Sequence, residues 1–553
     1  MQTSIADLDQ SLQKLSHGAA QLQSLSIGQR LDLVLQCIAG VDRLAQRWIT
    51  AACEAKKIDR NSPVASEEIT TGPISTIRFL QIFAGTLRDI QANGKPKIPG
   101  DVVRVHDQCR VAVFPTPLLY DSILFRPLSA ETWLQSEVQS DNLFDQNFDC
   151  ISGRSGDPKV VVVLGAGNVS SIPATDALTK ILIESSAVLL KMNPVNDYLG
   201  PIFEDAFKPL IDANMFSVAY GGVGEGEHLI NHASTNHVHI TGSIHSHDAI
   251  VWGNDDQRES RRESGKPQLQ KTITSELGNV TPWAIVPGDY TEKQLRFQAE
   301  MIATSITNNV SFNCIATKLI LTCRGWRQRD RFLEMIDEIF ARTQTRHAYY
   351  PGAADRFERF SGVTADDPTR LPWTLLTDID PNTSPYLLSE ESFTCVCGEL
   401  QIDADSAGDF LSIATDWMND RIWGTLAATL TVTDDFQSNH ADQLDECFRR
   451  LRYGTIGVNI WPALSFALMS PPWGGHPSGT LQDAQSGIGF VHNTYLLKQP
   501  EKTILRAPLT MSPKPIWHSN HRHPQRVTAD MLKLYARPSL LRLAKLALSS
   551  FTG

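Results

Sequence analysis

Apolar runs separated by longer mixed stretches mark the middle of this chain. One run of valines covers residues 159–164 and ends in a glycine turn, and others cover 187–191, 216–220 and 237–243. Strands without polar alternation are buried on both faces, as in a parallel sheet. Because strand-like and helix-like stretches alternate with short connections, the pattern predicts a doubly wound α/β domain over residues 159–285.

The regions on either side of this domain have different hydrophobic patterns. Residues 5–95 place apolar side chains at helical spacing and predict helices. Two short β-rich stretches follow at 102–105 and 111–115, whereas 130–157 is polar, rich in Ser and Asp, and is predicted to be loop. After the α/β domain, a second strand–helix region is expected over about 286–470.

Composition narrows the function classes. The chain has 553 residues, 42% of them hydrophobic, and a formal net charge of -11. An acidic chain has no electrostatic footprint for nucleic acid. Its nine cysteines form neither a disulfide framework nor a zinc spacing, which favours a reducing compartment. No secretion signal and no apolar run of roughly 20 residues is visible, so we expect a cytoplasmic protein.

Two residues suggest covalent chemistry. Cys314 lies in the segment Asn313-Cys314-Ile315, between a helix-like stretch and a β-rich one, and Glu276 precedes Leu277-Gly278. A thiolate is a good nucleophile, and a carboxylate can act as a general base. Taken alone, a single cysteine is usually an inert core residue, and a lone glutamate is usually exposed. The pair therefore needs support from the rest of the chain.

That support is an ordered set of motifs between about 159 and 485, which resembles the aldehyde dehydrogenase superfamily. In chain order, the matching positions are Asn168, Lys191, Thr241-Gly242-Ser243, Glu276-Leu277-Gly278, Cys314, Glu390-Glu391-Ser392-Phe393, Gly454–Asn459 and Pro471-Pro472-Trp473-Gly474-Gly475. The resemblance implies Cys314 as nucleophile, Glu276 as general base and Asn168 as oxyanion donor. It implies NAD or NADP as cofactor, held by Lys191, Thr241, Gly242, Ser243, Leu277, Gly278, Glu391 and Phe393.

The resemblance also implies an architecture. It predicts an α/β fold with a Rossmann-type nucleotide-binding domain, an α/β catalytic domain and a small β-flap for oligomerisation. The expected regions are a helical N-terminal region with flap strands near 102–125 (1–158), a dinucleotide-binding domain (159–285), a catalytic domain (286–470) and a C-terminal segment with a flap strand (471–553). The late flap strand is expected at 493–498. An unpaired edge strand is an aggregation hazard, so we expect a homodimer or homotetramer.

Two reactions remain open for this site. The first is oxidation of an aldehyde to a carboxylic acid through a cysteine-bound thiohemiacetal and thioester. The second is reduction of an acyl-CoA or another acyl thioester, or CoA-acylating aldehyde oxidation. Retention of Glu276 favours hydrolysis, whereas Lys191-Met192-Asn193-Pro194 departs from the usual Lys-Pro-Ser-Glu and resembles CoA-linked branches. A third class, a scaffold without catalysis, has no need of the full residue set.

Three side signals are weighed against simpler explanations. His518, His521 and His523 lie close enough to suggest zinc, but a solvated loop is favoured, and no metal site is expected. Cys395 and Cys397 are expected to be paired strand core residues. The tail after about 527 mixes leucines with basic residues; it could touch a membrane surface, but packing on its own or a neighbouring subunit is favoured.

Overall fold

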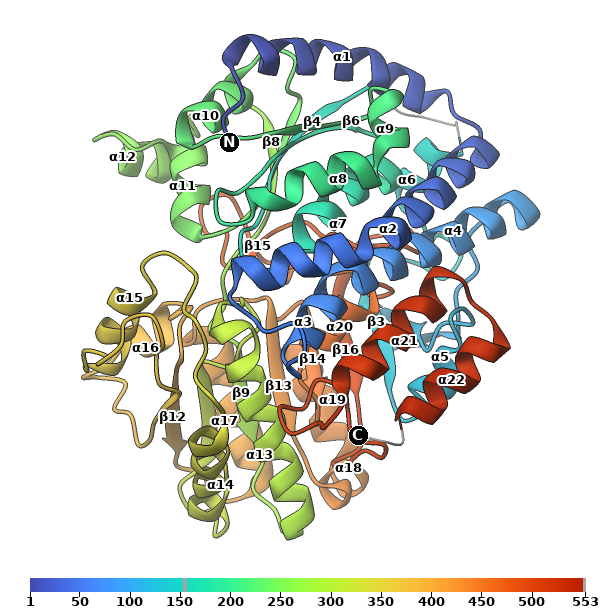
Figure 1. The fold of residues 1–553 in the computed structure, drawn as a ribbon. Coiled ribbons are helices and arrows are strands. Elements are labelled where there is room, and N and C mark those ends of the chain that lie inside the picture. The colour runs from blue at the N-terminus through green and yellow to red at the C-terminus, as the bar shows by residue number, and fades with distance from the viewer. Residues whose placement is uncertain (153–156, 551–553) are drawn as a thin grey trace.

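The computed structural model describes residues 1–152 and 157–550 and contains two sheets (Figure 1). The smaller sheet has six strands in the order β15-β8-β7-β4-β5-β6. Their bounds are β4 Val160–Leu164, β5 Ala187–Lys191, β6 Phe216–Ala219, β7 His237–Thr241, β8 Thr272–Glu276 and β15 Gly487–Ile488. β4 to β8 pair in parallel and β15 is antiparallel. The predicted parallel strands are therefore confirmed.

The larger sheet has ten strands in the order β1-β2-β3-β16-β14-β13-β9-β10-β12-β11. Its parallel part consists of β9 (Pro282–Ile285), β10 (Leu319–Cys323), β11 (Thr374–Leu376), β12 (Val396–Ile402), β13 (Ala427–Thr431), β14 (Thr455–Val458) and β16 (Pro500–Arg506). An antiparallel extension adds β1 (Val102–Val105), β2 (Gln108–Phe114) and β3 (Ser129–Leu134). Sheet membership changes between β8 and β9, so the two sheets meet at a short connection after Glu276.

Helices cover both faces of the six-stranded sheet. On one face, α1 (Ile5–Gln23) buries Leu8, Leu12 and Leu15 against Val160 and Leu189, and it crosses the top of the molecule in Figure 1. On the other face lie α7 (Ile172–Leu178) and η2 (Thr179–Ile183). The long helices α2 (Ile27–Ala55) and α4 (Ser75–Asn93) confirm the predicted helical N-terminal region.

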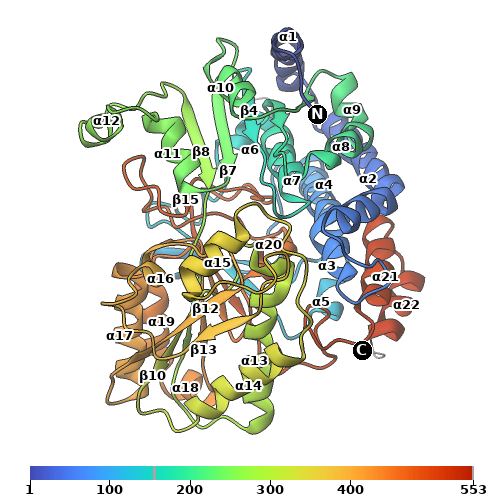
Figure 2. The same cartoon turned by 60° about the vertical axis from the view of Figure 1, so that its left-hand side comes forward.

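The remaining helices mostly connect the strands. Around the six-stranded sheet these are α8 (Gly200–Ala206), α9 (Lys208–Asp212), α10 (Val223–Asn231), α11 (Ile244–Trp252) and α12 (Arg258–Glu263). Around the ten-stranded sheet they are α13 (Glu292–Thr307), α14 (Arg329–Arg342), α15 (Ala353–Ser361), α16 (Tyr386–Ser389), α17 (Ala407–Asp420), α18 (Asp434–Asn439), α19 (Ala441–Arg450) and α20 (Ala463–Leu468). Figure 2 shows α13, α14 and α17 gathered around that sheet.

Two predictions about irregular segments are wrong. The stretch 130–157, predicted as loop, contains β3 and α6 (Gln146–Ile151) in its described part, because Ala130, Thr132 and Leu134 share one buried face of β3 and Trp133 is buried on the other face. The late strand that extends the sheet is β16 at Pro500–Arg506, whereas 493–498 forms a turn with an isolated bridge at Leu497. The hairpin therefore continues the chain's own ten-stranded sheet through β3 and β16.

The C-terminal tail packs on its own chain, which agrees with the expectation that it packs on protein. α21 (Pro524–Ala536) buries Val527 and Tyr535 beside α3 (Ala65–Ile69), and Arg78 donates to the Tyr535 hydroxyl at 3.2 Å. α22 (Leu540–Ser550) follows α21 and leaves Leu541 82% exposed. No described helix is long and apolar enough to cross a membrane.

The structure also places the other two side signals, the histidines at 518, 521 and 523 and the cysteine pair at 395 and 397. His518 and His521 are buried, and the His518 ring lies 4.6 Å from that of Phe297 on α13, so the predicted solvated loop is wrong for these two residues. Aromatic packing, which spacing alone does not reveal, accounts for His518. Cys395 and Cys397 are both buried core residues, as expected. Among the described residues, no group of three metal-ligating side chains converges.

Candidate active site

Cys314 follows a strained turn at the junction of the two sheets. α13 ends at Thr307, and Asn309, Val310 and Ser311 then have φ angles of 49°, 57° and 63°. Left-handed backbone costs a β-branched residue such as Val310 about 1–3 kcal/mol. The Asn309 N–H donates to Glu67 at 3.0 Å, which helps to hold the turn. The turn directs the next residues, and with them the thiol, into the space between the domains.

Glu276 faces that thiol. It is the last residue of β8, is buried, and its Oε1 lies 3.3 Å from the Cys314 Sγ, which donates to it. Burial and the nearby charge of Asp176 raise the pKa of Glu276 to about 7. Burial and the negative charges of Glu276 and Glu391 raise the pKa of Cys314 well above its usual value. The Cys314 sulfur is therefore held as a thiol, and it donates to Glu276.

Two cavities meet at this pair. A cleft of about 530 Å³ and an apolar cavity of about 90 Å³ are both lined by Ile172, Glu276 and Cys314. The thiol and its carboxylate therefore face two separate binding spaces. Such a junction suits a reaction in which one bound molecule passes atoms to another.

Asn168, the predicted oxyanion donor, is fixed beside the Cys314 turn. Its amide nitrogen donates to the Phe312 carbonyl at 3.1 Å, and its second amide hydrogen remains for another acceptor. The backbone carbonyl of Asn168 accepts from Lys56, Asn309 and Tyr349 at 3.1, 3.0 and 2.9 Å. This buried network, with the Lys56–Glu68 ion pair at 2.7 Å, was not predicted.

Lys318 and Glu391 form a second unpredicted contact near the thiol. The Lys318 ammonium lies 3.4 Å from Glu391 and donates to the Asn313 and Cys314 carbonyls at 3.0 and 3.3 Å. A Cβ at Gly278 would lie 2.2 Å from the Glu391 carboxylate, so a larger residue at this position would displace that carboxylate. The Lys318 charge acts to lower the pKa of Cys314, against the effect of burial.

The larger cleft contains most of the predicted cofactor residues. Its walls include Thr241, Gly242, Ser243, Leu277, Gly278, Glu391 and Phe393, together with Asn168. Lys191 ends β5 and does not line it. Hydroxyls and a carboxylate suit sugar hydroxyl groups, and Leu277 and Phe393 suit the flat face of a ring. The donor set therefore fits a nicotinamide dinucleotide.

The smaller cavity was not predicted from the sequence. Its walls are Trp461, Leu464, Phe466, Trp473, Ile516 and Trp517, with Thr70 and Thr71 on one side. Trp517 belongs to the C-terminal segment, where its indole N–H donates to the Met301 sulfur at 3.3 Å. Such side chains resemble ordinary core residues in the sequence, so no local signal marks them.

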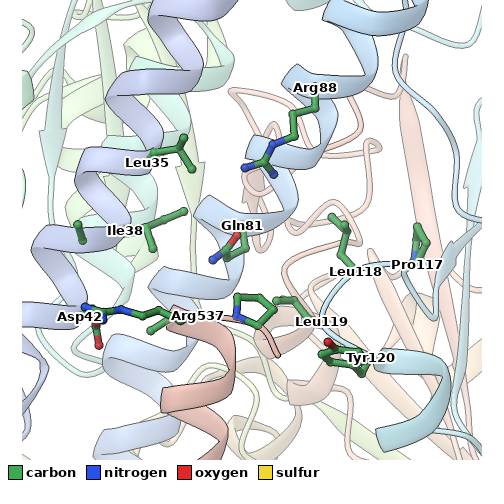
Figure 3. A pocket seen from close by; sticks show the side chains of 13 residues that line it. Leu35, Ile38, Asp42, Gln81, Arg88, Pro117, Leu118, Leu119, Tyr120 and Arg537 are labelled. Atoms are coloured by element: carbon green, nitrogen blue, oxygen red, sulfur yellow. Dashed lines mark ion pairs between the residues drawn. The ribbon is translucent and has the colours of Figure 1, made fainter. Parts of the chain in front are cut away.

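A larger hollow of about 600 Å³ lies elsewhere, between α2, α4 and the segment 117–120 (Figure 3). Asp42 and Arg537 form an ion pair of 3.3 Å at its edge. It shares no lining residue with either cavity at Cys314. Size alone therefore does not identify the reactive site.

Comparison with known proteins agrees with this geometry at the level of fold. No protein-family model matches the sequence, and no curated protein matches it. Solved structures do match. One is an indole-3-acetaldehyde dehydrogenase in complex with NAD+ (17% identity, TM-score 0.60, covering 91% of this chain and 90% of that one).

Two further solved structures match. One is an NAD-dependent aldehyde dehydrogenase from Sinorhizobium meliloti (14%, TM-score 0.61, 93% and 89%). The other is a glyceraldehyde-3-phosphate dehydrogenase from Methanocaldococcus jannaschii in complex with NADP (14%, TM-score 0.59, 91% and 95%). The likeness extends over nearly the whole chain, and so it reaches well into the N-terminal region that carries no matching motif. Two parallel-rich sheets, with a cysteine and a carboxylate between them, give this chain the fold of the aldehyde dehydrogenases.

Proposed function

We propose that this protein is an NAD(P)-dependent dehydrogenase that oxidises an apolar aldehyde to a carboxylic acid through a thioester on Cys314. The observation that carries the proposal is the contact of 3.3 Å between the Cys314 thiol and Glu276, at the junction of a polar cleft and an aromatic cavity. The solved structures of similar fold that bind NAD+ or NADP support the choice of cofactor.

The first half of the reaction forms the thioester. Glu276 accepts the thiol proton as the Cys314 sulfur attacks the aldehyde carbon, and the carbonyl oxygen becomes an oxyanion. The free amide hydrogen of Asn168 stabilises that oxyanion. A dinucleotide bound in the cleft would supply the hydride acceptor. When the hydride and its electron pair leave the aldehyde carbon, the carbonyl re-forms as a thioester.

The second half releases the acid. Glu276, deprotonated again, takes a proton from water, whose oxygen attacks the thioester carbon. The C–S bond breaks, Glu276 returns the proton taken from water to the sulfur, and the carboxylic acid departs. A carboxylate in contact with the thiol is the group that hydrolysis requires, and its retention supports water as acyl acceptor over CoA.

The test follows reduced cofactor across a panel of aliphatic and aromatic aldehydes, with NAD+ or NADP+ and with or without CoA. Purified protein should form NAD(P)H without CoA, and Cys314→Ala should abolish this. Cys323→Ala, which removes a buried cysteine near the end of β10, is the matched control and should remain active. Turnover in Cys314→Ala equal to that of the native protein would exclude this nucleophile, and strict dependence on CoA would favour the acyl-thioester alternative.

A further inference from the structure

A polar stripe runs along one face of the six-stranded sheet. β7 and β8 pair in parallel, with His239 opposite Thr274 and Thr241 opposite Glu276. Alternate residues of a strand share a face, so His237 lies on the same side. The stripe packs under α7 and η2, which are buried helices. Strands covered on both faces usually carry apolar side chains, so this polar stripe needs a reason.

Hydrogen bonds and one longer ion-pair contact connect the stripe, and His239 Nε2 also lies 3.5 Å from the Thr241 hydroxyl. Thr274 Oγ1 lies 3.0 Å from His237 Nε2 and 2.9 Å from His239 Nδ1. The other ring nitrogen of His239 lies 3.6 Å from the Asp176 carboxylate. Asp176 also accepts from the Thr241 hydroxyl at 2.7 Å. Hydroxyl and imidazole groups each both donate and accept, so a proton can pass along such a series.

The inner end of the series lies at Glu276. Thr241 is its partner in the strand register, and Asp176 is the charge that acts on it most strongly. Among the described residues, one carboxylate oxygen of Glu276 and one of Asp176 are buried without a hydrogen-bond partner. No hydrogen bond joins Glu276 to Asp176 or Thr241 among the described residues, so a proton that leaves Glu276 crosses to Asp176 through a water molecule or a rotation of the carboxylate.

The outer end approaches the surface. His239 and Asp176 are buried, whereas His237 is partly exposed. Lys180 also donates to Thr274, at 3.2 Å, and pairs with the partly exposed Glu184 at 2.7 Å. Burial and the charges of Lys180 and Lys159 lower the pKa of His237 to about 2. Its ring is therefore neutral and passes a proton by exchanging one ring hydrogen for another.

We propose that Thr241, Asp176, His239, Thr274 and His237 form a proton exit from Glu276 to the surface. The inference rests on the proposed function. In that reaction Glu276 takes up the thiol proton, and the substrate hydrogen leaves as hydride, so one proton per thioester remains on Glu276. This proton must depart before Glu276 can activate water. The exit therefore serves the second half of the reaction, and its members are positioning residues.

The kinetic test compares two substitutions at the link. Thr274→Val removes the hydroxyl at constant size, and Thr274→Ser restores it. In Thr274→Val the first burst of NAD(P)H should stay within twofold of native, while steady-state turnover falls at least tenfold and its solvent isotope effect rises. Thr274→Ser should recover turnover. His228→Gln, which alters a partly exposed histidine paired with Asp9, is the matched control and should behave as native.

A second measurement is independent of catalysis. In protein labelled with ¹⁵N-histidine, exchange of the His239 ring hydrogen with water should be slower in Thr274→Val than in Thr274→Ser. Equal exchange of the His239 ring hydrogen in Thr274→Val and Thr274→Ser would contradict the proposed proton exit. Equal steady-state turnover in the two variants would also contradict it, provided that the native protein is active. Absence of NAD(P)H formation in the native protein contradicts the proposed function instead, and the exchange measurement still decides whether the path exists.

Discussion

The two cavities that meet at Cys314 have walls of different chemistry, although both walls include Ile172, Glu276 and Cys314. The cleft on one side is lined by glycines, hydroxyls and the Glu391 carboxylate, whereas the cavity on the other side is lined by tryptophans, Phe466 and aliphatic side chains. The first suits a polar dinucleotide and the second an apolar acyl chain. Under the proposed function, binding specificity for the two reactants is built separately, and Glu276 and Cys314 carry the chemistry between them.

The largest effect is expected for Glu276→Gln, because Glu276 lines both cavities and is the proposed base in both halves of the reaction. Loss of a general base typically costs about 10²–10⁴-fold, so steady-state turnover should fall by that factor while binding of cofactor and aldehyde changes little. Rapid-quench and steady-state assays measure it. Glu292→Gln, at an exposed glutamate on α13, is the control. A fall of less than about tenfold would remove Glu276 from the chemical step.

Glu391→Gln tests the cofactor side through KM, although loss of its charge also acts on the pKa of Cys314. A hydrogen bond to a charged group contributes about 1.5–3 kcal/mol, which corresponds to about 10–100-fold in affinity. The KM for NAD(P) should rise by that factor, with the KM for aldehyde unchanged. Loss of the negative charge also leaves Lys318 without its ion-pair partner. An increase in aldehyde KM alone would contradict the division into two sides.

The two sides also differ in how well the sequence predicted them. Thr241, Glu276 and Glu391 were predicted because each lies in a motif that resembles one of the aldehyde dehydrogenase superfamily, in the same order along the chain. Lys318 was not, since a lysine before an apolar run resembles any strand entrance. Trp517 lies far along the chain from Cys314 and contributes only apolar surface. Lys318 and Trp517 reach the site through tertiary packing, which no short segment of the sequence reveals.

The fold shows the same contrast. The valine-rich β4 was predictable because a strand buried on both faces has one dominant pattern. β3 was not, because it is short and half polar and is stabilised by its pairing with β2 and β16, which are distant in sequence. Its prediction depends on partners that no local window contains.

Trp517→Ala tests the substrate side alone. Removal of the indole enlarges the apolar cavity and deprives a bound acyl chain of contact area. At about 25 cal/mol per Å², loss of about 50 Å² of contact corresponds to roughly tenfold in kcat/KM. We expect that fall for aldehydes that fill the native cavity, a smaller fall for longer ones, and an unchanged KM for NAD(P). Trp417→Ala, at a partly exposed tryptophan beside Arg421, is the control. A change in cofactor KM without a change in aldehyde selectivity would reverse the assignment of the two sides.

The smallest effect expected is that of pH, which acts on the shared carboxylate. Glu276 is active as a base when deprotonated, and burial with the Asp176 charge raises its pKa from 4.5 to about 7. Its active form therefore increases as pH rises through 7, and turnover should increase up to about tenfold between pH 6 and 8. Asp176→Asn removes the neighbouring negative charge, so the midpoint should move to lower pH. KM values for aldehyde and cofactor should stay nearly constant over the same range, because neither binding space depends on that proton. A midpoint near the ordinary pKa of a glutamate would mean that water reaches Glu276 in the working enzyme, and that the two sides are less separate than their walls indicate.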